Sequence, residues 1–284
     1  MLVQQIVNGL TVGAIYAVVA SGLTLVYGVL RILHVAHAGI YTLGAYLGVV
    51  TYARTHSLAL AFAAAMAGSG VAGWAVQRWI YLPLLSQPRI VPLIASIGLY
   101  IALEDLFRLA AGPYSLAFSA RLPVGPLAAG GLTITPAQIL VAAVGAPLLV
   151  AAWWVLTRTR VGLAWRALAD DAPMAAASGV DVGRAVGLNV LLGSALAGAA
   201  GVLVGVFFNA VEPTMGSVPA YKGLAIIVLG GLGSFPGAVA AALLLGVVEA
   251  VAIGTVGLLP RDALAFIALI AILLLRPQGL WGRR

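Results

Sequence analysis

Few side chains in this sequence could carry out chemistry, and together they form no enzyme motif. His34 and His37 are three residues apart and would share a helix face, as a pair of metal ligands would. No carboxylate or third histidine stands at a matching spacing, so we expect no metal site and no cofactor. Cysteine and a G-x-S-x-G motif are absent, and the only lysine, Lys222, belongs to no phosphate-binding loop. The sequence therefore predicts a chain that is not an enzyme and does not itself hydrolyse ATP.

Acidic residues also occur inside apolar segments, where an ionisable group is a functional candidate by default. Glu104 and Arg108 are four residues apart and can pair on one helix face, so a local ion pair is favoured there. Glu249 lies deeper in its segment and has no cation close to it in sequence. For Glu249, a place on a transport pathway and a hydrogen bond between helices both stay open.

A polar island occupies residues 157–184. It contains seven charged residues: Arg158, Arg160, Arg166, Asp170, Asp171, Asp181 and Arg184. Asp170 or Asp171 could cap a short helix that has Pro173 in its first turn, and Gly179 could end it. A short helix presenting small residues suits a groove on a soluble partner, whereas a solvated loop is the alternative.

The elements that carry these residues follow from composition. The chain has 284 residues, of which 63% are hydrophobic and 8% charged, too few charges for a soluble surface. Scattered basic residues exclude nucleic-acid binding. We predict an all-α polytopic membrane bundle in one domain, 1–284, with about 8–10 spanning or partly spanning helices. The apolar segments are 7–30, 38–53, 58–80, 90–111, 136–156, 185–211, 223–257 and 263–275.

Loop charges predict the orientation, because cytoplasmic loops are enriched in basic residues. The loop with Arg78 and Arg89 and the island at 157–184 should both be cytoplasmic, and the loop 112–135 external. Simple crossings would then leave the C-terminal arginines outside. Helix breaks near 31–38 and 230–237 remove this conflict, and such paired breaks are typical of a translocation path. Ordinary turns near the membrane interface are the alternative.

Several motifs occur in a fixed order along nearly the whole chain. They are N-G-L-T-V-G-A-I-Y-A at 8–17, H-V-A-H-A-G at 34–39, the island motif at 166–180, L-G-G-L-G-S-F-P-G-A at 229–238 and R-P-Q-G-L at 276–280. This series resembles the permease subunits of branched-chain amino acid ABC importers of the Liv type. The sequence departs from that family at His34, where the family has Asn, at Ala38, and at Glu104 and Asp105.

The resemblance implies one permease subunit in a bacterial or archaeal inner (plasma) membrane. Its partners would be the lipid bilayer, a homologous second permease, two ATP-binding cassette ATPases and an extracytoplasmic substrate-binding protein. The substrate would be a branched-chain or related hydrophobic amino acid. Urea or a short amide is the alternative within the family, and a stand-alone secondary transporter is the alternative from another class.

The resemblance also implies functional residues. The family's ATPase-docking motif, E-A-A-x-x-x-G, aligns with Pro173, Met174, Ala175 and Gly179, so its acidic position is lost and Asp170 or Asp171 is the candidate to replace it. The predicted ATPase-coupling residues are Arg166, Asp170, Asp171, Pro173, Met174, Ala175 and Gly179. The translocation-path candidates are Asn8, His34, His37, Gly39, Gly230, Gly231, Gly233, Ser234, Pro236 and Glu249.

Overall fold

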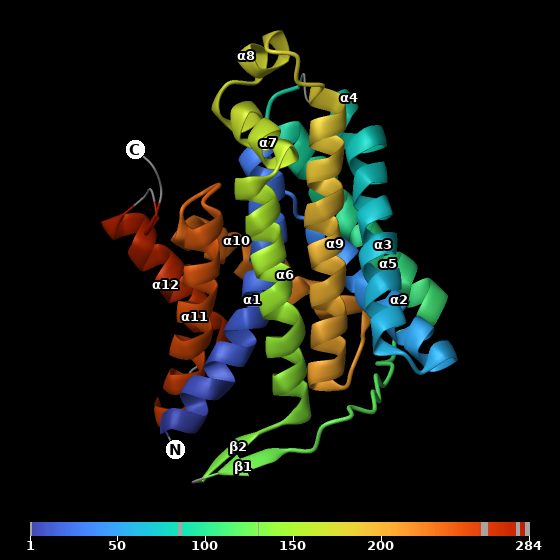
Figure 1. The fold of residues 1–284 in the computed structure, drawn as a ribbon, viewed down its shortest axis with the longest axis vertical. Helices are drawn as coiled ribbons and strands as arrows, with labels where there is room; N and C mark the ends of the chain where they lie inside the picture. Colours follow the sequence, from blue (N-terminus) through green and yellow to red (C-terminus); the bar gives the residue numbers. More distant parts are fainter. Residues whose placement is uncertain (1, 85–86, 130, 257–260, 277–278, 282–284) are drawn as a thin grey trace.

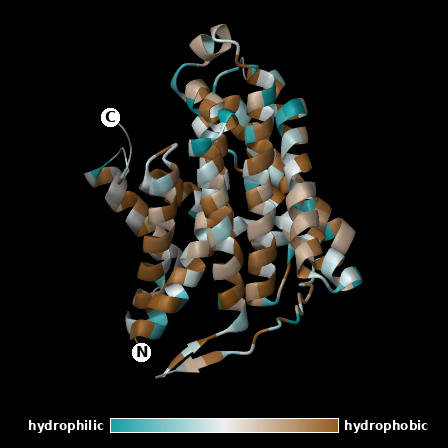
Figure 2. Cartoon of the chain, viewed as in Figure 1, coloured by the Kyte–Doolittle hydropathy of each residue, from teal (hydrophilic) through white to brown (hydrophobic). Residues whose placement is uncertain are grey.

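The chain is a bundle of α-helices, as the sequence predicted (Figure 1). A computed structural model describes residues 2–84, 87–129, 131–256, 261–276 and 279–281. In this part of the chain six helical stretches are long and apolar enough to cross a membrane: Leu2–Leu30, Leu58–Leu84, Ile90–Ala111, Pro136–Arg158, Val182–Phe208 and Phe235–Thr255. Hydrophobic residues cover most of these helices, and the teal, hydrophilic positions concentrate toward their ends (Figure 2).

The helices follow one another in the order expected for repeated crossings. They are α1 (Leu2–Leu30), α2 (His37–Thr55), α3 (Leu58–Val76), α4 (Leu82–Leu84), α5 (Ile90–Ala111), α6 (Pro136–Arg158), α7 (Arg160–Asp170), α8 (Ala172–Ala177), α9 (Val182–Phe208), α10 (Ser217–Gly230), α11 (Phe235–Val256) and α12 (Arg261–Leu275). A π-helix, η1 (Gln77–Tyr81), joins α3 to α4, and a 3₁₀ helix, η2 (Pro213–Gly216), precedes α10.

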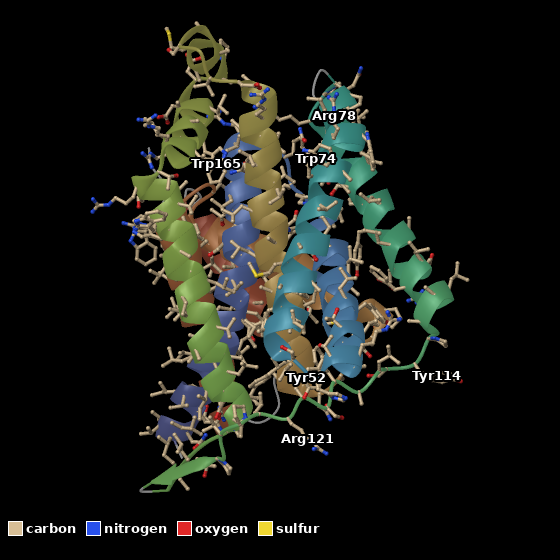
Figure 3. The ribbon with its side chains drawn as sticks, turned by 45° about the vertical axis from the view of Figure 1, so that its right-hand side comes forward. Tyr52, Trp74, Arg78, Tyr114, Arg121 and Trp165 are labelled. Carbon is tan, nitrogen blue, oxygen red and sulfur yellow. The ribbon has the colours of Figure 1, made fainter. Side chains whose placement is uncertain are left out.

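The two ends of the bundle differ in character. One end, here called the basic end, carries α4, α7 and α8, and Arg78 lies there (Figures 1 and 3). The opposite, hairpin end carries Arg121, Tyr114 and two short antiparallel strands, β1 (Leu127–Ala129) and β2 (Leu132–Ile134). The all-α prediction did not include this hairpin. The basic loop after α3 and the polar island lie at one end, as their charge predicted.

Both predicted helix breaks are present. α1 ends at Leu30, Arg31 has a positive φ of 51°, and the next helix starts only at His37. The chain also leaves helical geometry after α10, where Gly231 and Gly233 have φ values of 102° and 82°. Only glycine adopts such values at little cost, which explains the glycine-rich sequence of this turn. Pro277 and Gln278 of the C-terminal motif, and Arg283 and Arg284, lie outside the described residues.

A third interruption was not predicted. α9 ends at Phe208, with Asn209 in the left-handed region, and the chain then turns back into the bundle. A Cβ at Gly216 would lie 2.7 Å from the Ala38 carbonyl and from the Thr42 hydroxyl oxygen, both in the first turns of α2. Gly216, the residue before α10, is therefore packed against α2, whereas Ser217 at the start of α10 is exposed. The 14 residues of α10 span about 21 Å, less than the roughly 30 Å of a hydrocarbon core.

Glycines bring the central helices into backbone contact. On α1, a Cβ at Gly9 would lie 2.6 Å from Cα of Val247, and a Cβ at Gly13 would lie 2.9 Å from Cα of Leu243. On α9, the backbone of Gly198 packs directly against Gly44 of α2. The hydrophobic effect does not drive helices together in lipid, because lipid tails are as apolar as the side chains. Close packing through small residues stabilises helix association instead.

Candidate coupling and translocation sites

α8 is a short helix fixed at both ends by its own sequence. The Asp171 carboxylate accepts the Met174 N–H at 3.0 Å and caps the N-terminus, so Asp171, and not Asp170, is the cap. Gly179, at φ 88°, donates its N–H to the Ala176 carbonyl at 3.0 Å, and Val180 donates to Ala175 at 3.1 Å. This pair of bonds is a Schellman ending, which needs a left-handed residue at the position of Gly179.

α7 attaches α8 to the bundle. The Trp165 indole N–H donates to the Ala185 carbonyl of α9 at 2.7 Å, and Trp165 and Leu168 are buried. The Arg31 guanidinium, in the first helix break, donates to the Ala169 carbonyl at 2.6 Å. Arg166 donates to the Leu156 carbonyl at the end of α6. α7 is therefore bonded to α6, to α9 and to the first break.

The outer face of α8 is open. Met174 is 64% exposed, and Pro173, Asp170 and Asp171 are exposed as well, while Ala175 turns inward and is buried. In Figure 1, α8 projects beyond the long helices at the basic end. Among the predicted coupling residues, Arg166, Asp170, Asp171, Pro173 and Met174 thus have exposed side chains. α8 is of a size and shape to be held by a soluble partner.

The two histidines are buried at the first break. His34 lies in the non-helical segment and His37 starts α2, so the expectation that they share a helix face was wrong. Their rings lie edge to face, with the ring centroids 5.5 Å apart. His34 Nδ1 lies 2.6 Å from the Tyr81 hydroxyl, which donates to Ser96 Oγ at 2.9 Å. No group of three or more His, Cys, Asp or Glu side chains that could hold a metal ion occurs in the described residues.

Sequence reasoning missed the elements that hold this histidine pair. The Ser96 Oγ also accepts the Ala36 N–H at 2.9 Å, so α5 supports the backbone of the break. Tyr81 ends the π-helix η1, and a π-helical turn frequently marks a functional position. The R-W-I-Y sequence gave no sign that this turn would be π-helical.

Glu249 has a partner that is distant in sequence. Lys222 Nζ on α10 lies 2.8 Å from Glu249 Oε1 on α11, and it donates to the Tyr16 hydroxyl of α1 at 3.0 Å. The Tyr16 hydroxyl in turn donates to Glu249 Oε2 at 3.2 Å. Lys222 and Glu249 are 1% and 2% exposed. Glu249 therefore joins three helices, and Lys222 and Tyr16 are site residues that the sequence did not reveal.

Two cavities adjoin these groups. The first, the α10 cavity, has a volume of about 390 Å³ and lies between α1, α2, α9, residues 210–215 and α10. Lys222 and Tyr16 line it. The second, the basic-end cavity, has a volume of about 700 Å³ and is lined by the ends of α1 and α6, by α7 and by the 232–236 turn. It contains the predicted path residues Gly233, Ser234 and Pro236.

The remaining path candidates lie apart from the described cavity walls. Asn8 accepts a hydrogen bond from Gln138 at 2.8 Å near the hairpin end. A Cβ at Gly39 would meet Leu103 of α5 at 2.7 Å, so Gly39 is a packing position. Gly230 packs against Gly237 across the second turn, and the Gly230 carbonyl accepts the Trp281 N–H at 3.1 Å. The predicted path residues therefore do not form one continuous lining.

The charged residues of α5 form a separate, partly exposed group. Arg108 pairs with Glu104 at 2.5 Å and with Asp105 at 3.0 Å. Arg108 and Asp105 are largely exposed, so this is the local ion pair that the spacing favoured. Such exposed pairs contribute about 0–1 kcal/mol to stability.

Comparison with known proteins covers nearly the whole chain. Residues 5–275 match the model of the family described as "Branched-chain amino acid transport system / permease component". "High-affinity branched-chain amino acid transport system permease protein BraD" of Pseudomonas aeruginosa is 35% identical over 99% of this chain and 95% of its own length. The corresponding "LivH" protein of Escherichia coli K12 is 32% identical with the same coverage. The matched range includes α8, both predicted breaks and the Lys222–Glu249 pair.

Proposed function

The chain belongs to the family of branched-chain amino acid transport permeases, and on this premise we propose its place in an importer. It is a membrane-spanning permease subunit of an ATP-binding-cassette importer for branched-chain or related hydrophobic amino acids. The family is a transport family, and energy comes from separate ATPase subunits. The whole chain acts as one transmembrane domain, with 157–184 as its cytoplasmic coupling loop, in the plasma membrane of a bacterium or archaeon.

The observation that carries this proposal is the exposed, doubly capped α8 at the basic end. α8 docks into a cleft of a cytoplasmic ATPase, and each of two ATPases holds one permease subunit of a homologous pair. When nucleotide closes the ATPases, the docked helices move with them. The contacts of α7 with α1, α6 and α9 pass this motion to the bundle. A substrate-binding protein delivers the amino acid at the hairpin end.

Co-purification of the ATPases with the permease tests the docking. Asp171→Lys removes the cap of α8, Asp170→Lys reverses the neighbouring charge, and Gly179→Pro forbids the left-handed ending and removes its N–H donor. Each variant should insert into the membrane normally but lose ATPase association. The control is Asp105→Lys, which makes the same charge reversal at an exposed position on α5 and should retain ATPase association. Normal association of all three α8 variants would exclude α8 as the docking element.

Transport by the assembled system tests the substrate. Proteoliposomes that contain both permeases, the ATPases and the binding protein should accumulate leucine, isoleucine and valine when ATP is present on the ATPase side. Accumulation of urea or a short amide in place of these amino acids would assign the chain to the alternative substrate class. Accumulation without ATPases would make it a secondary transporter.

A further inference from the structure

The α10 cavity has the composition of a small-molecule site. Apolar side chains form most of its walls, among them Ile15, Val19, Val204 and Ile226. Glu212 and Lys222 contribute charges of opposite sign. Its volume of about 390 Å³ falls in the range of roughly 300–1,000 Å³ that ligand pockets occupy.

We propose that the α10 cavity binds the transported amino acid during its passage. The carboxylate lies at Lys222 and the Tyr16 hydroxyl, the ammonium lies toward Glu212, and the branched side chain rests on the apolar wall. This inference rests on the proposed function and adds a binding site to it.

Lys222 is positioned to meet a carboxylate from the cavity. Its ammonium is held at 2.8 Å by Glu249, which belongs to α11 and is not among the described residues of the cavity wall. Tyr16 lines the cavity and reaches both members of the pair. A carboxylate that enters the cavity therefore meets the cation and a hydroxyl, with Glu249 behind them. Buried ion pairs seldom add net stability to a fold. A role in binding therefore explains the Lys222–Glu249 pair in this apolar setting better than a role in stability does.

The start of α10 adds positive potential to the same wall. α10 begins at Ser217, directly after η2 and without a side-chain cap, and Val218 and Pro219 of its first turn line the cavity. The N-terminus of a helix carries a partial positive charge. Interrupted helices of transporters direct such ends toward anionic groups of their substrates.

Glu212 completes the match to a zwitterion. It stands just before η2, is exposed, and lies on the cavity wall. An amino acid offers a carboxylate to Lys222, an ammonium to Glu212 and an apolar side chain to the remaining wall. Urea or a short amide presents no charge to either residue, and a site built for polar contacts discriminates strongly against a ligand that lacks the matching groups.

Photo-cross-linking in the full-length permease, reconstituted in nanodiscs, tests the site. The probe is a diazirine analogue of leucine. We expect adducts on peptides covering residues 12–19 and 218–226, displaced by excess leucine. The analogue without the carboxylate, 3-methylbutylamine, and the one without the ammonium, 4-methylpentanoate, should each compete at least tenfold more weakly. Adducts elsewhere, or adducts that leucine does not displace, would overturn the proposal.

Two variants with matched controls locate the contacts. Glu212→Gln should weaken competition by leucine at least fivefold, whereas Asp105→Asn removes an exposed carboxylate outside the cavity and should have no effect. Val12→Phe adds an aromatic ring to the cavity wall and should abolish the adducts. Its control, Leu10→Phe, adds the same ring at an exposed position of α1 and should leave the adducts unchanged. Unchanged adducts and competition in both cavity variants would refute the site.

Uptake by the complete importer separates this inference from the proposed function. If the wild-type importer accumulates leucine and both cavity variants accumulate it at the wild-type rate, the function stands and the binding site is wrong. If the wild-type importer accumulates no branched-chain amino acid, the proposed function is wrong. Uptake reduced at least fivefold in both cavity variants, with normal ATPase association, supports the site.

Discussion

Removing one member of the Lys222–Glu249 pair should cost more than removing both. The two side chains are almost fully buried and their charged atoms are 2.8 Å apart. Lys222→Gln leaves the Glu249 carboxylate buried with the Tyr16 hydroxyl and no cation. Breaking such a pair from one side lowers the free energy of unfolding by about 3–5 kcal/mol. In the double variant, Lys222→Gln with Glu249→Gln, two amides face each other and no charge is buried, so the loss should be about 1 kcal/mol.

Thermal unfolding in nanodiscs, followed by tryptophan fluorescence, measures these differences. At about 2–3 °C per kcal/mol for a chain of this size, Lys222→Gln should lower Tm by about 6–15 °C and the double variant by no more than about 3 °C. Comparison of the single and double variants gives the coupling between the two side chains. If the double variant loses as much stability as the two single variants together, the side chains are not coupled and the reasoning from the buried pair is wrong.

Three further variants test other contacts. Gly9→Val should lower stability by about 3 kcal/mol because its Cβ meets the backbone of α11, whereas Gly98→Val, with open space around it, should not; thermal unfolding compares them. Gly179→Ala strains a left-handed position by about 1–2 kcal/mol and should reduce ATPase co-purification, whereas Gly183→Ala should leave it intact. Glu104→Gln breaks a partly exposed pair and should change Tm by no more than about 3 °C.

The local features of the fold were predictable from sequence. Pro173 and Gly179 specify the ends of α8 through contacts within a few residues and were predicted from spacing, whereas the sequence left the cap open between Asp170 and Asp171 and the structure assigns it to Asp171. The breaks near 31–38 and 230–237 followed from charge parity and from glycine, because Gly231 and Gly233 permit backbone angles that other residues avoid.

Features that depend on distant contacts were not predictable. Lys222 and Glu249 are 27 residues apart on separate helices, and Tyr16 is 233 residues from Glu249. Only the tertiary packing of α1, α10 and α11 brings them together. The re-entrant segment after α9 was also missed, although Glu212 and Pro213 interrupt the apolar sequence there and are the signal that could have revealed it.

The glycine contacts of α1 limit the ways in which the bundle can deform. α1 lies with its main chain against α11 at Gly9 and Gly13, and against α9 where Gly22 meets Gly193. At these points no long side chain stands between the helices to change rotamer and absorb sliding. These contacts favour movement of the three helices as one unit, so we expect a displacement applied through α7 to turn them together rather than to slide one past another.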